Sequence, residues 1–361
     1  MIEAAVVIVG GGPGGSACAW RLAQRGIDSV VLEAEPFPRT KLCAGWITPD
    51  VVRALEMDVE RYPRGLLRLD NLHMEYFGRR RSWRTDMRSE QYSIRRYEFD
   101  DWLLRKSGAR VVTHAARAVE RVGDGFVVDG QFRSRFLVGA GGTHCPVFRS
   151  LFKGLNPRSR EYQVAALEEE FEYAGADQRC HLWFGENGLV GYAWYVPKQG
   201  GWVNVGLGGF SRYLAESRVG LHEHWQALAD KLASLGLVVG HRFKPKGHTY
   251  YLREREEVCQ VGNAYLVGDA AGLATLDLAE GIGPAIQSGL NAALSIATGR
   301  AYSLDGVPRY SLIGAGSLPS RLARLIDRRG LVFRDWIYAR NWQAKEADFL
   351  ATHAREDATA S

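Results

Sequence analysis

The sequence predicts an α/β fold, with a Rossmann-type dinucleotide-binding domain, an interleaved and mostly antiparallel β-sheet domain, and helices at the C-terminus. Two observations carry this prediction. A glycine-rich turn joins an apolar strand pattern to a helix pattern at the N-terminus, and a second strand, turn and helix pattern begins at residue 264. The chain has 361 residues, more than the roughly 250–300 at which a single core stops growing, so we expect more than one unit.

The first nucleotide-binding pattern begins with a run of apolar, β-branched residues over 4–9, typical of a strand buried on both faces of a parallel sheet. The turn after it reads GGGPGG. Gly10 permits the tight turn, Gly12 lets the backbone approach a pyrophosphate, and Gly15 lets the helix pack on the strand. Pro13 suits a first helical turn. The predicted binding residues of this turn are Gly10, Gly12, Pro13, Gly14 and Gly15.

An acidic residue follows at the expected distance. A helix pattern runs to Gly26, a strand is predicted over 29–32, and Glu33 lies 18 residues beyond Gly15. A carboxylate at this place accepts the ribose hydroxyls and repels a 2′-phosphate. The pattern therefore indicates FAD or NAD and excludes NADP.

The second pattern favours FAD over NAD. A strand is predicted over 264–267, followed by Gly268-Asp269 and by a small-residue helix that begins near Gly281. A carboxylate suits the ribityl hydroxyls of FAD, and the helix N-terminus, with Gly281, Ile282 and Gly283, offers backbone donors to the flavin pyrimidine edge. The alternative is that Asp269 only caps a helix.

Over roughly residues 4–300 the sequence resembles the FAD-dependent geranylgeranyl reductase family, within the larger para-hydroxybenzoate hydroxylase-like fold group. Five segments in shared order carry the resemblance: GGGPGG from residue 10, PRTKLCAG from 38, Arg96 with Phe99-Asp100, YAWYVPK from 192 with VGLG from 205, and GDAAG from 268 with EGIG from 280.

The resemblance implies further cofactor contacts. The loop Lys41–Gly45 would lie beside the flavin, Arg96 on the pyrophosphate side, and the segment 139–142 over the nucleotide. The residues implied are Arg39, Lys41, Ala44, Gly45, Arg96, Ala140 and Gly141. Two departures stand out: Gly141-Gly142 where larger relatives often carry an aspartate, and Thr275-Leu276 in place of the usual Asn-Pro.

The predicted substrate half is rich in aromatic residues. Strands are expected over 163–171, 181–184, 193–196 and 202–207, with a hairpin at 198–201. Strand alternation puts Tyr192, Trp194 and Val196 on one face. These rings either line an apolar or aromatic ligand or fill the core, and the substrate candidates are Trp46, Tyr192 and Trp194. The glycines at 206–209 are interpreted as crowding in a sheet, not as a second nucleotide loop.

Cys43 is the candidate catalytic residue, because a thiol beside the flavin could donate a proton or order the loop. The alternative is a small packing residue. For Lys41 we favour an anchoring role over a chemical one. The five cysteines show no metal-like spacing, so we expect reduced thiols and no metal site.

The leading hypothesis is an FAD-dependent oxidoreductase that reduces a carbon–carbon double bond in an apolar, prenyl-like substrate. The alternative is a flavin monooxygenase that hydroxylates an aromatic or indole group, including one on a client protein during quinone-cofactor maturation. A third hypothesis is a flavoprotein that only relays electrons. The electron donor would be NAD(P)H or a protein.

Composition sets the other expectations. The excess of 46 Lys and Arg over 41 Asp and Glu is scattered, which argues against nucleic acid. No segment approaches the roughly 20 apolar residues of a membrane span, so we expect a cytoplasmic chain. The basic C-terminal stretch is expected to form solvated capping helices, with peripheral membrane or partner contact as the alternative.

The predicted domain boundaries are discontinuous. The FAD-binding domain comprises residues 1–65, 95–155 and 255–305, and the substrate domain comprises 66–94 and 156–254. A C-terminal helical region covers 306–361.

Overall fold

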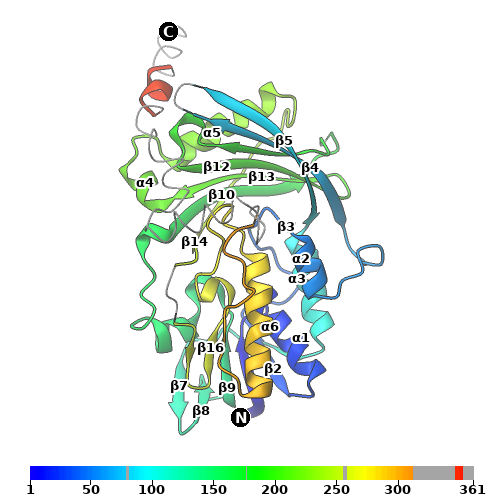
Figure 1. The fold of residues 1–361 in the computed structure, drawn as a ribbon, viewed down its shortest axis with the longest axis vertical. Coiled ribbons are helices and arrows are strands. Elements are labelled where there is room, and N and C mark those ends of the chain that lie inside the picture. The colour runs from blue at the N-terminus through cyan, green and yellow to red at the C-terminus, as the bar shows by residue number, and fades with distance from the viewer. Residues whose placement is uncertain (79–80, 176, 255–257, 312–345, 353–361) are drawn as a thin grey trace.

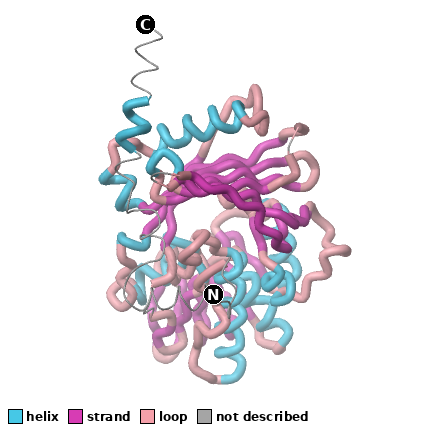
Figure 2. The backbone as a smooth tube through the Cα atoms, turned by 45° about the horizontal axis from the view of Figure 1, so that its top comes forward, coloured by secondary structure: helices cyan, strands magenta, loops and turns pink. Residues whose placement is uncertain are grey.

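The computed structural model describes residues 1–78, 81–175, 177–254, 258–311 and 346–352. Two eight-stranded sheets form the described part, and each contains strands that are distant in sequence. One sheet carries helices α1, α2, α3 and α6 beside it, and the other arches over this unit (Figures 1 and 2). The predicted α/β fold with parallel and antiparallel sheets is confirmed.

The first sheet is built around five parallel strands in the order β16-β9-β1-β2-β6. Strand β15 and the hairpin β7-β8 add antiparallel neighbours. Strand β16 pairs with β9, so the chain returns to the same sheet as the sequence predicts. The strands are β1 (Ile2–Val9), β2 (Ser29–Glu33), β6 (Arg110–Thr113), β7 (Val119–Val122), β8 (Gly125–Val128), β9 (Phe132–Gly139), β15 (Gln260–Val261) and β16 (Ala264–Leu266).

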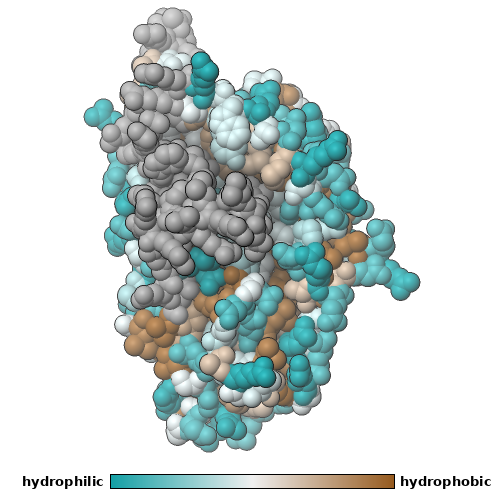
Figure 3. Space-filling view, in the orientation of Figure 1, coloured by the Kyte–Doolittle hydropathy of each residue, from teal (hydrophilic) through white to brown (hydrophobic). Residues whose placement is uncertain are grey.

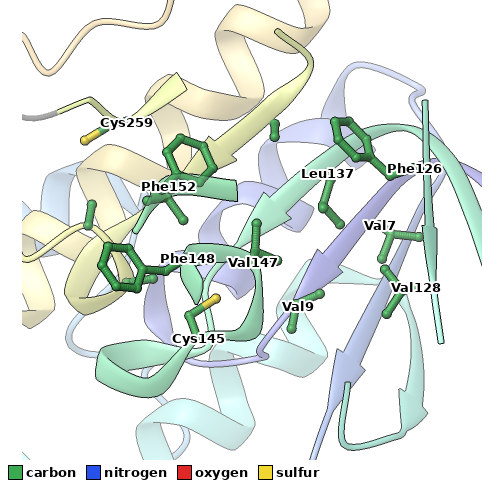
Figure 4. Close-up of a cluster of buried hydrophobic side chains, with 14 of the residues drawn as sticks. Val7, Val9, Phe126, Val128, Leu137, Cys145, Val147, Phe148, Phe152 and Cys259 are labelled. Carbon is green, nitrogen blue, oxygen red and sulfur yellow. The ribbon is translucent and has the colours of Figure 1, made fainter. Parts of the chain in front are cut away.

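Both faces of β1 are buried over residues 6–9, as the apolar run predicts, whereas Ala4 is half-buried and Ala5 exposed. Val6 and Ile8 pack toward the helices, in one cluster with residues of α1 and α6. Val7 and Val9 pack on the opposite face, where the close-up in Figure 4 shows them with Val128 and with the aromatic rings of the following segments. The helices of this unit are α1 (Pro13–Gln24), α2 (Pro49–Ala54), α3 (Arg96–Ser107) and α6 (Ile282–Thr298).

The second sheet is antiparallel except at one pair. Its order is β14-β10-β13-β12-β11-β4-β5-β3, with β11 and β4 parallel. The strands are β3 (Trp46–Ile47), β4 (Leu66–Phe77), β5 (Ser82–Ile94), β10 (Gln163–Glu172), β11 (Cys180–Phe184), β12 (Gly191–Lys198), β13 (Trp202–Phe210) and β14 (Lys246–Tyr251). The predicted strands of this half are present and extend a few residues further than predicted.

The two faces of the second sheet have different coverings. Helix α5 (Leu221–Ser234) packs on the outer face, and α4 (Ser211–Glu216) follows β13. Tyr195 and Leu207 belong to the outer core with Trp225 of α5. Trp194 and Leu182 belong to a different cluster on the inner face. The sheet therefore separates a packed outer core from an inner face that looks toward the nucleotide-binding unit.

Glycines in β13 make room for large side chains. A Cβ on Gly206 would lie 2.3 Å from the ring of Trp194 and 2.8 Å from Cβ of Glu168. Gly206 pairs with both of these residues in the register of the sheet. The interpretation of residues 206–209 as sheet crowding is confirmed.

Two predictions stay open. Strand β3 lies within the range 1–65 yet pairs with β5 of the second sheet, and the domain boundaries stay a prediction. The predicted C-terminal helices fall mostly on residues 312–345 and 353–361, outside the described residues. Glu346 accepts a hydrogen bond from the backbone of Val219 at 3.1 Å.

Hydrophilic and hydrophobic groups are interspersed over the visible described surface (Figure 3).

Gly206→Ala should lower the free energy of unfolding by about 1–3 kcal/mol, because the added methyl group overpacks the Trp194 site. Urea unfolding at constant pH measures this. Gly154→Ala is the control, because a Cβ there meets nothing within 4 Å. Equal stabilities of the two variants would contradict the crowding argument.

Candidate active site

A cavity of about 1030 Å³ lies between the two sheets. This is the upper end of the size range of ligand pockets, roughly 300–1,000 Å³. Its walls come from the glycine turn, β2, the loop after residue 38, the inner face of the second sheet and the segment 267–285. The cavity thus collects segments from the two halves of the chain.

Most of the predicted site residues line this cavity. They are Gly10, Gly12, Pro13, Gly14, Glu33, Arg39, Lys41, Cys43, Ala44, Trp46, Arg96, Ala140, Gly141, Tyr192, Trp194, Gly268, Asp269, Gly281 and Ile282. Three predicted residues, Gly15, Gly45 and Gly283, lie outside the lining. Gly15 packs instead against the backbone of Gly10, where a Cβ would lie 2.0 Å from the carbonyl oxygen. That contact is the helix-to-strand approach expected of this glycine.

The glycine turn leaves a helix N-terminus open to the cavity. Helix α1 begins at Pro13, its N-cap is Gly12, and no side chain caps it. The first N–H groups of a helix without a cap, together with the helix dipole, attract an anion. A Cβ on Gly12 would meet only Nη2 of Arg39, at 3.7 Å. This end of the cavity therefore suits a pyrophosphate.

Glu33 is placed at the end of β2 with its carboxylate oriented by the turn. The N–H of Gly11 donates to Oε2 at 2.6 Å, and Nε of Arg39 lies 3.4 Å from Oε1. The side chain is buried and lines the cavity. A carboxylate held in this way is ready to accept ribose hydroxyls.

Two arginines lie near the turn, and they differ in how tightly a carboxylate holds them: Arg96 forms a bidentate hydrogen-bonded pair, whereas Arg39 forms only longer ion pairs, with Glu33 at 3.4 Å and Asp100 at 3.7 Å. Arg96 donates from Nε and Nη2 to Asp100 at 2.6 and 2.7 Å, a bidentate pair within α3. Arg39 faces Gly12 and lies 3.7 Å from Asp100. Arg39 is therefore better placed for a pyrophosphate than Arg96, whose predicted contact on that side stays a prediction.

Asp269 lines the cavity. It follows β16 in a 3-10 turn, Gly268–Ala270. Among the described residues no hydrogen bond to its carboxylate is present, so Asp269 does not cap α6 by a side-chain bond. The backbone N–H of Gly283, in the first turn of α6, instead donates to Oε1 of Glu280 at 2.6 Å. Burial raises the pKa of Glu280 to about 7.

The loop Lys41–Gly45 is tied to the second sheet. The buried ammonium of Lys198 on β12 donates to the carbonyl oxygens of Ala44 at 2.6 Å and Ile94 at 2.8 Å. Nδ2 of Asn204 donates to the carbonyl of Cys43 at 3.3 Å. Gly45 has φ +67°, and a Cβ there would lie 2.1 Å from the carbonyl oxygen of Ile94. The sheet thus fixes the conformation of this loop.

Cys43 lines the cavity within that fixed loop. The N–H of Gly45 lies 3.4 Å from its Sγ, and Arg96 contacts the thiol. Burial raises the pKa of Cys43, and the Arg96 guanidinium opposes this. These contacts fit both an ordering role and a proton-donor role, so its catalytic role stays a prediction.

One face of β12 lines the cavity, as strand alternation predicts. Tyr192, Trp194 and Val196 are lining residues, whereas Tyr195 lies in the outer core. The polar atoms of the two rings are occupied: Nε1 of Trp194 donates to Asn204 at 2.7 Å, and the Tyr192 hydroxyl donates to the carbonyl of Leu278. These rings therefore present apolar surface to the cavity.

Three more apolar groups complete this wall. Trp46 lines it from β3, with Nε1 donating to Gln91 at 2.8 Å. Leu182 of β11 and Ala166 of β10 also line it. Such a wall suits an apolar or aromatic ligand.

Sequence reasoning missed two polar residues on the same wall. Glu168 of β10 and His248 of β14 both line the cavity. Both carboxylate oxygens of Glu168, and Nδ1 of His248, are buried without a hydrogen-bond partner among the described residues. The sequence hides Glu168 in a run of three glutamates. Its only signal is the pairing with Gly206 in the sheet register.

The two departures from the family pattern have different positions. Gly141 and Gly142 line the cavity and leave it without a carboxylate there. Thr275 and Leu276 lie outside the lining, and Oγ1 of Thr275 accepts from the N–H of Glu280 at 3.0 Å. The Thr275 segment therefore acts on the cavity through the turn that it supports.

The walls together fit FAD. The uncapped α1 N-terminus and its glycines suit the pyrophosphate, Glu33 the ribose, and Asp269 the ribityl chain. The fixed Lys41–Gly45 loop and the apolar sheet face lie where the flavin ring and its substrate would meet.

The described residues hold no group of three or more His, Cys, Asp or Glu side chains that is suited to a metal ion. A search of the same residues found no helix with the length and apolarity to cross a membrane. All five cysteines are free of disulfides.

Comparison with known proteins identifies the cofactor class. Residues 5–102 match the family model "FAD dependent oxidoreductase". An uncharacterised protein of Methanosarcina barkeri is 29% identical over 80% of this chain and 73% of its own length. A menaquinone reductase of Mycobacterium tuberculosis is 31% identical over 58% of this chain and 56% of its own. A digeranylgeranylglycerophospholipid reductase of Methanothermobacter thermautotrophicus is 27% identical over 62% and 59%. The chain thus spans little more than half the length of the two named reductases.

Solved structures share the fold. A geranylgeranyl bacteriochlorophyll reductase-like protein of Thermoplasma acidophilum superposes with a TM-score of 0.71 at 21% identity, covering 96% of this chain and 87% of its own. A flavin-dependent brominase superposes with a TM-score of 0.68 at 17% identity, covering 99% and 92%. The resemblance drawn from the sequence motifs is confirmed, and the chain is an FAD-dependent oxidoreductase.

Asp269→Ala should weaken FAD binding roughly 10- to 100-fold, because hydrogen bonds to a charged group contribute about 1.5–3 kcal/mol. Titration of the apoprotein with FAD, followed by flavin fluorescence, measures this. Asp305→Ala is the control, since that side chain is exposed and lies outside the cavity lining. Unchanged affinity in Asp269→Ala would contradict the role given to this carboxylate.

Proposed function

We propose that this chain, an FAD-dependent oxidoreductase related to the geranylgeranyl reductase family, reduces a carbon–carbon double bond in an apolar, prenyl-like substrate. The observation that carries the proposal is the two-walled cavity, in which residues suited to FAD face an apolar strand surface. Relatives named as prenyl-lipid and menaquinone reductases support the same substrate class.

The apolar wall supports a long hydrocarbon ligand. Tyr192 and Trp194 have their polar atoms bonded within the protein, so their rings offer hydrophobic contact without specific hydrogen bonds. Val196 and Leu182 extend this surface along neighbouring strands. A prenyl chain has no polar group to satisfy, and its burial here is favourable at about 25 cal/mol per Å² of apolar surface.

The protein's own part in the reaction is positioning. The bound flavin supplies hydride chemistry. The Lys198-anchored loop fixes one side of the reaction space, and the inner face of the second sheet excludes water from the other. A substrate carbon held between them is oriented for transfer.

A flavin monooxygenase that hydroxylates an aromatic or indole group is the second candidate. The aromatic lining favours it, and the brominase with the same fold shows that this architecture also serves oxidative flavin enzymes. The variant in which the group belongs to a client protein rests only on the basic C-terminal stretch.

We propose that the electron donor is external, either NAD(P)H or a reduced protein, acting in the cytoplasm. The glycines at 206–209 lie within β13, and no second Rossmann unit is present among the described strands and helices. A nicotinamide donor would therefore bind transiently.

The two enzymatic candidates are separated by an anaerobic experiment. The photoreduced holoenzyme, mixed without oxygen with a geranylgeranyl lipid or a menaquinone, should reoxidise its flavin and yield the saturated product in equal amount. Mass spectrometry of the product checks the gain of two hydrogen atoms. Failure with every prenyl substrate, together with substrate-dependent oxygen uptake and labelled-oxygen incorporation into an aromatic compound, would establish the monooxygenase instead.

A further inference from the structure

The cavity wall contains a carboxyl group that does not contribute to holding the fold together. Glu168 is 1% exposed, and neither of its oxygens has a hydrogen-bond partner among the described residues. Leaving a buried polar group unpaired costs about 1–3 kcal/mol, and more for a charged group. The fold is therefore less stable with this glutamate than with a paired or apolar residue, which points to a role in function.

Its neighbours on the same strand show the contrast. Oε1 of Glu169 bonds His241 at 3.0 Å, on the opposite face of the sheet. Oε1 of Glu170 accepts from Nε of Arg95 at 2.9 Å. Of the three consecutive glutamates, only Glu168 lines the cavity and only Glu168 is left unpaired.

The surroundings of Glu168 suit an acid that gives up a proton and takes it back. Burial raises its pKa to about 8, and Lys198, Lys41 and Arg96 act in the opposite direction. The group is thus protonated at neutral pH, and the carboxylate left after proton loss faces three cations. The other titratable groups facing it are Glu170 on β10, Cys43 in the loop and His248 on β14.

We propose that the Glu168 carboxylic acid donates the proton that completes reduction of the substrate double bond. This inference rests on the proposed function. In the reaction the π bond breaks, one alkene carbon gains a hydride with two electrons from the reduced flavin, and the other forms a C–H bond with the Glu168 proton. Oxidised flavin and the Glu168 carboxylate remain, and the carboxylate regains a proton from water.

Cys43 is the competing donor, and its contacts make it the weaker one. Its sulfur is engaged by the N–H of Gly45 and by Arg96. Both oxygens of Glu168 are free of such contacts. Glu168 also stands on the wall with Trp194 and Ala166, where the apolar substrate would lie.

The test compares Glu168→Gln with Glu172→Gln, a control on the same strand whose side chain is exposed. In the photoreduced, FAD-loaded enzyme, Glu168→Gln should slow flavin reoxidation by the prenyl substrate by about 10²–10⁴-fold, the usual contribution of a general acid. Photoreduction of the bound flavin should stay unchanged. The wild-type reoxidation rate should fall as the pH rises through about 8, and this step should be absent in Glu168→Gln. Glu168→Asp should recover part of the rate.

A second readout needs no turnover. Since the raised pKa makes the native state bind more protons than the unfolded state between pH 4.5 and about 8, stability falls as pH rises through this window. The melting temperature of Glu168→Gln minus that of wild type should therefore be larger at pH 9 than at pH 5. For Glu172→Gln the same difference should not change between the two pH values. A carboxylic acid C=O infrared band that titrates with the same pKa should be present in wild type and missing in Glu168→Gln.

The outcomes separate the two proposals. If the wild-type enzyme reduces no alkene, the proposed function fails, while the infrared band and the stability shift still report the state of Glu168. If wild type and Glu168→Gln reoxidise at equal rates with the same pH dependence, the proton-donor assignment is overturned and the proposed function stands. Loss of the pH step in a Cys43→Ser variant, with the step retained in Glu168→Gln, would likewise overturn it in favour of the thiol.

Discussion

The buried ammonium of Lys198 is the interaction on which the site depends. It lies at the end of β12 and donates to backbone carbonyls of two other segments, the Lys41–Gly45 loop and the end of β5. Burial lowers its pKa, and the charge is compensated by hydrogen bonds and by Glu170 at 3.9 Å. Breaking such a buried pairing is costly, because it leaves carbonyl oxygens or a charge without partners. One side chain thereby fixes the Lys41–Gly45 wall of the cavity to the wall formed by the second sheet.

The remaining geometry follows from this connection. With the loop fixed, the inner face of the second sheet is held in place relative to the glycine turn, and under the proposed function the enclosed space would take one cofactor and one apolar ligand. Trp194 serves both walls, since its ring faces the cavity while Nε1 donates to Asn204, which in turn bonds the loop at Cys43. Gly206 is required for that ring to fit. Packing and site geometry are therefore parts of one network.

The nucleotide-binding half was predictable because its function is carried by backbone geometry. Close approaches at Gly10 and Gly15 leave few alternatives to glycine, so the motif is visible in the sequence. The lining face of β12 was equally predictable from alternation alone.

The polar groups of the substrate wall were hidden, because their positions depend on tertiary pairing. Strand alternation puts Glu168 and Glu169 on opposite faces, but which face lines the cavity follows from the packing of the sheet, and the register sets Glu168 beside Gly206. The same holds for Lys198. The residue ends the YAWYVPK segment that carries the family resemblance, but its hydrogen-bond partners lie about 100 and 150 residues away in the sequence. Likewise, Arg96 was expected at the pyrophosphate, but its bidentate pair with Asp100 leaves Arg39 as the arginine facing the turn.

The central claim is that a flavin and an apolar chain occupy the same cavity, and ligand titration of the oxidised holoenzyme tests it most directly. A saturated prenyl lipid, which cannot react, should shift the flavin absorption band and quench tryptophan fluorescence, both saturating at one ligand per flavin. A flavin spectrum that stays unchanged up to the solubility limit of the lipid, with no quenching, would contradict the shared cavity.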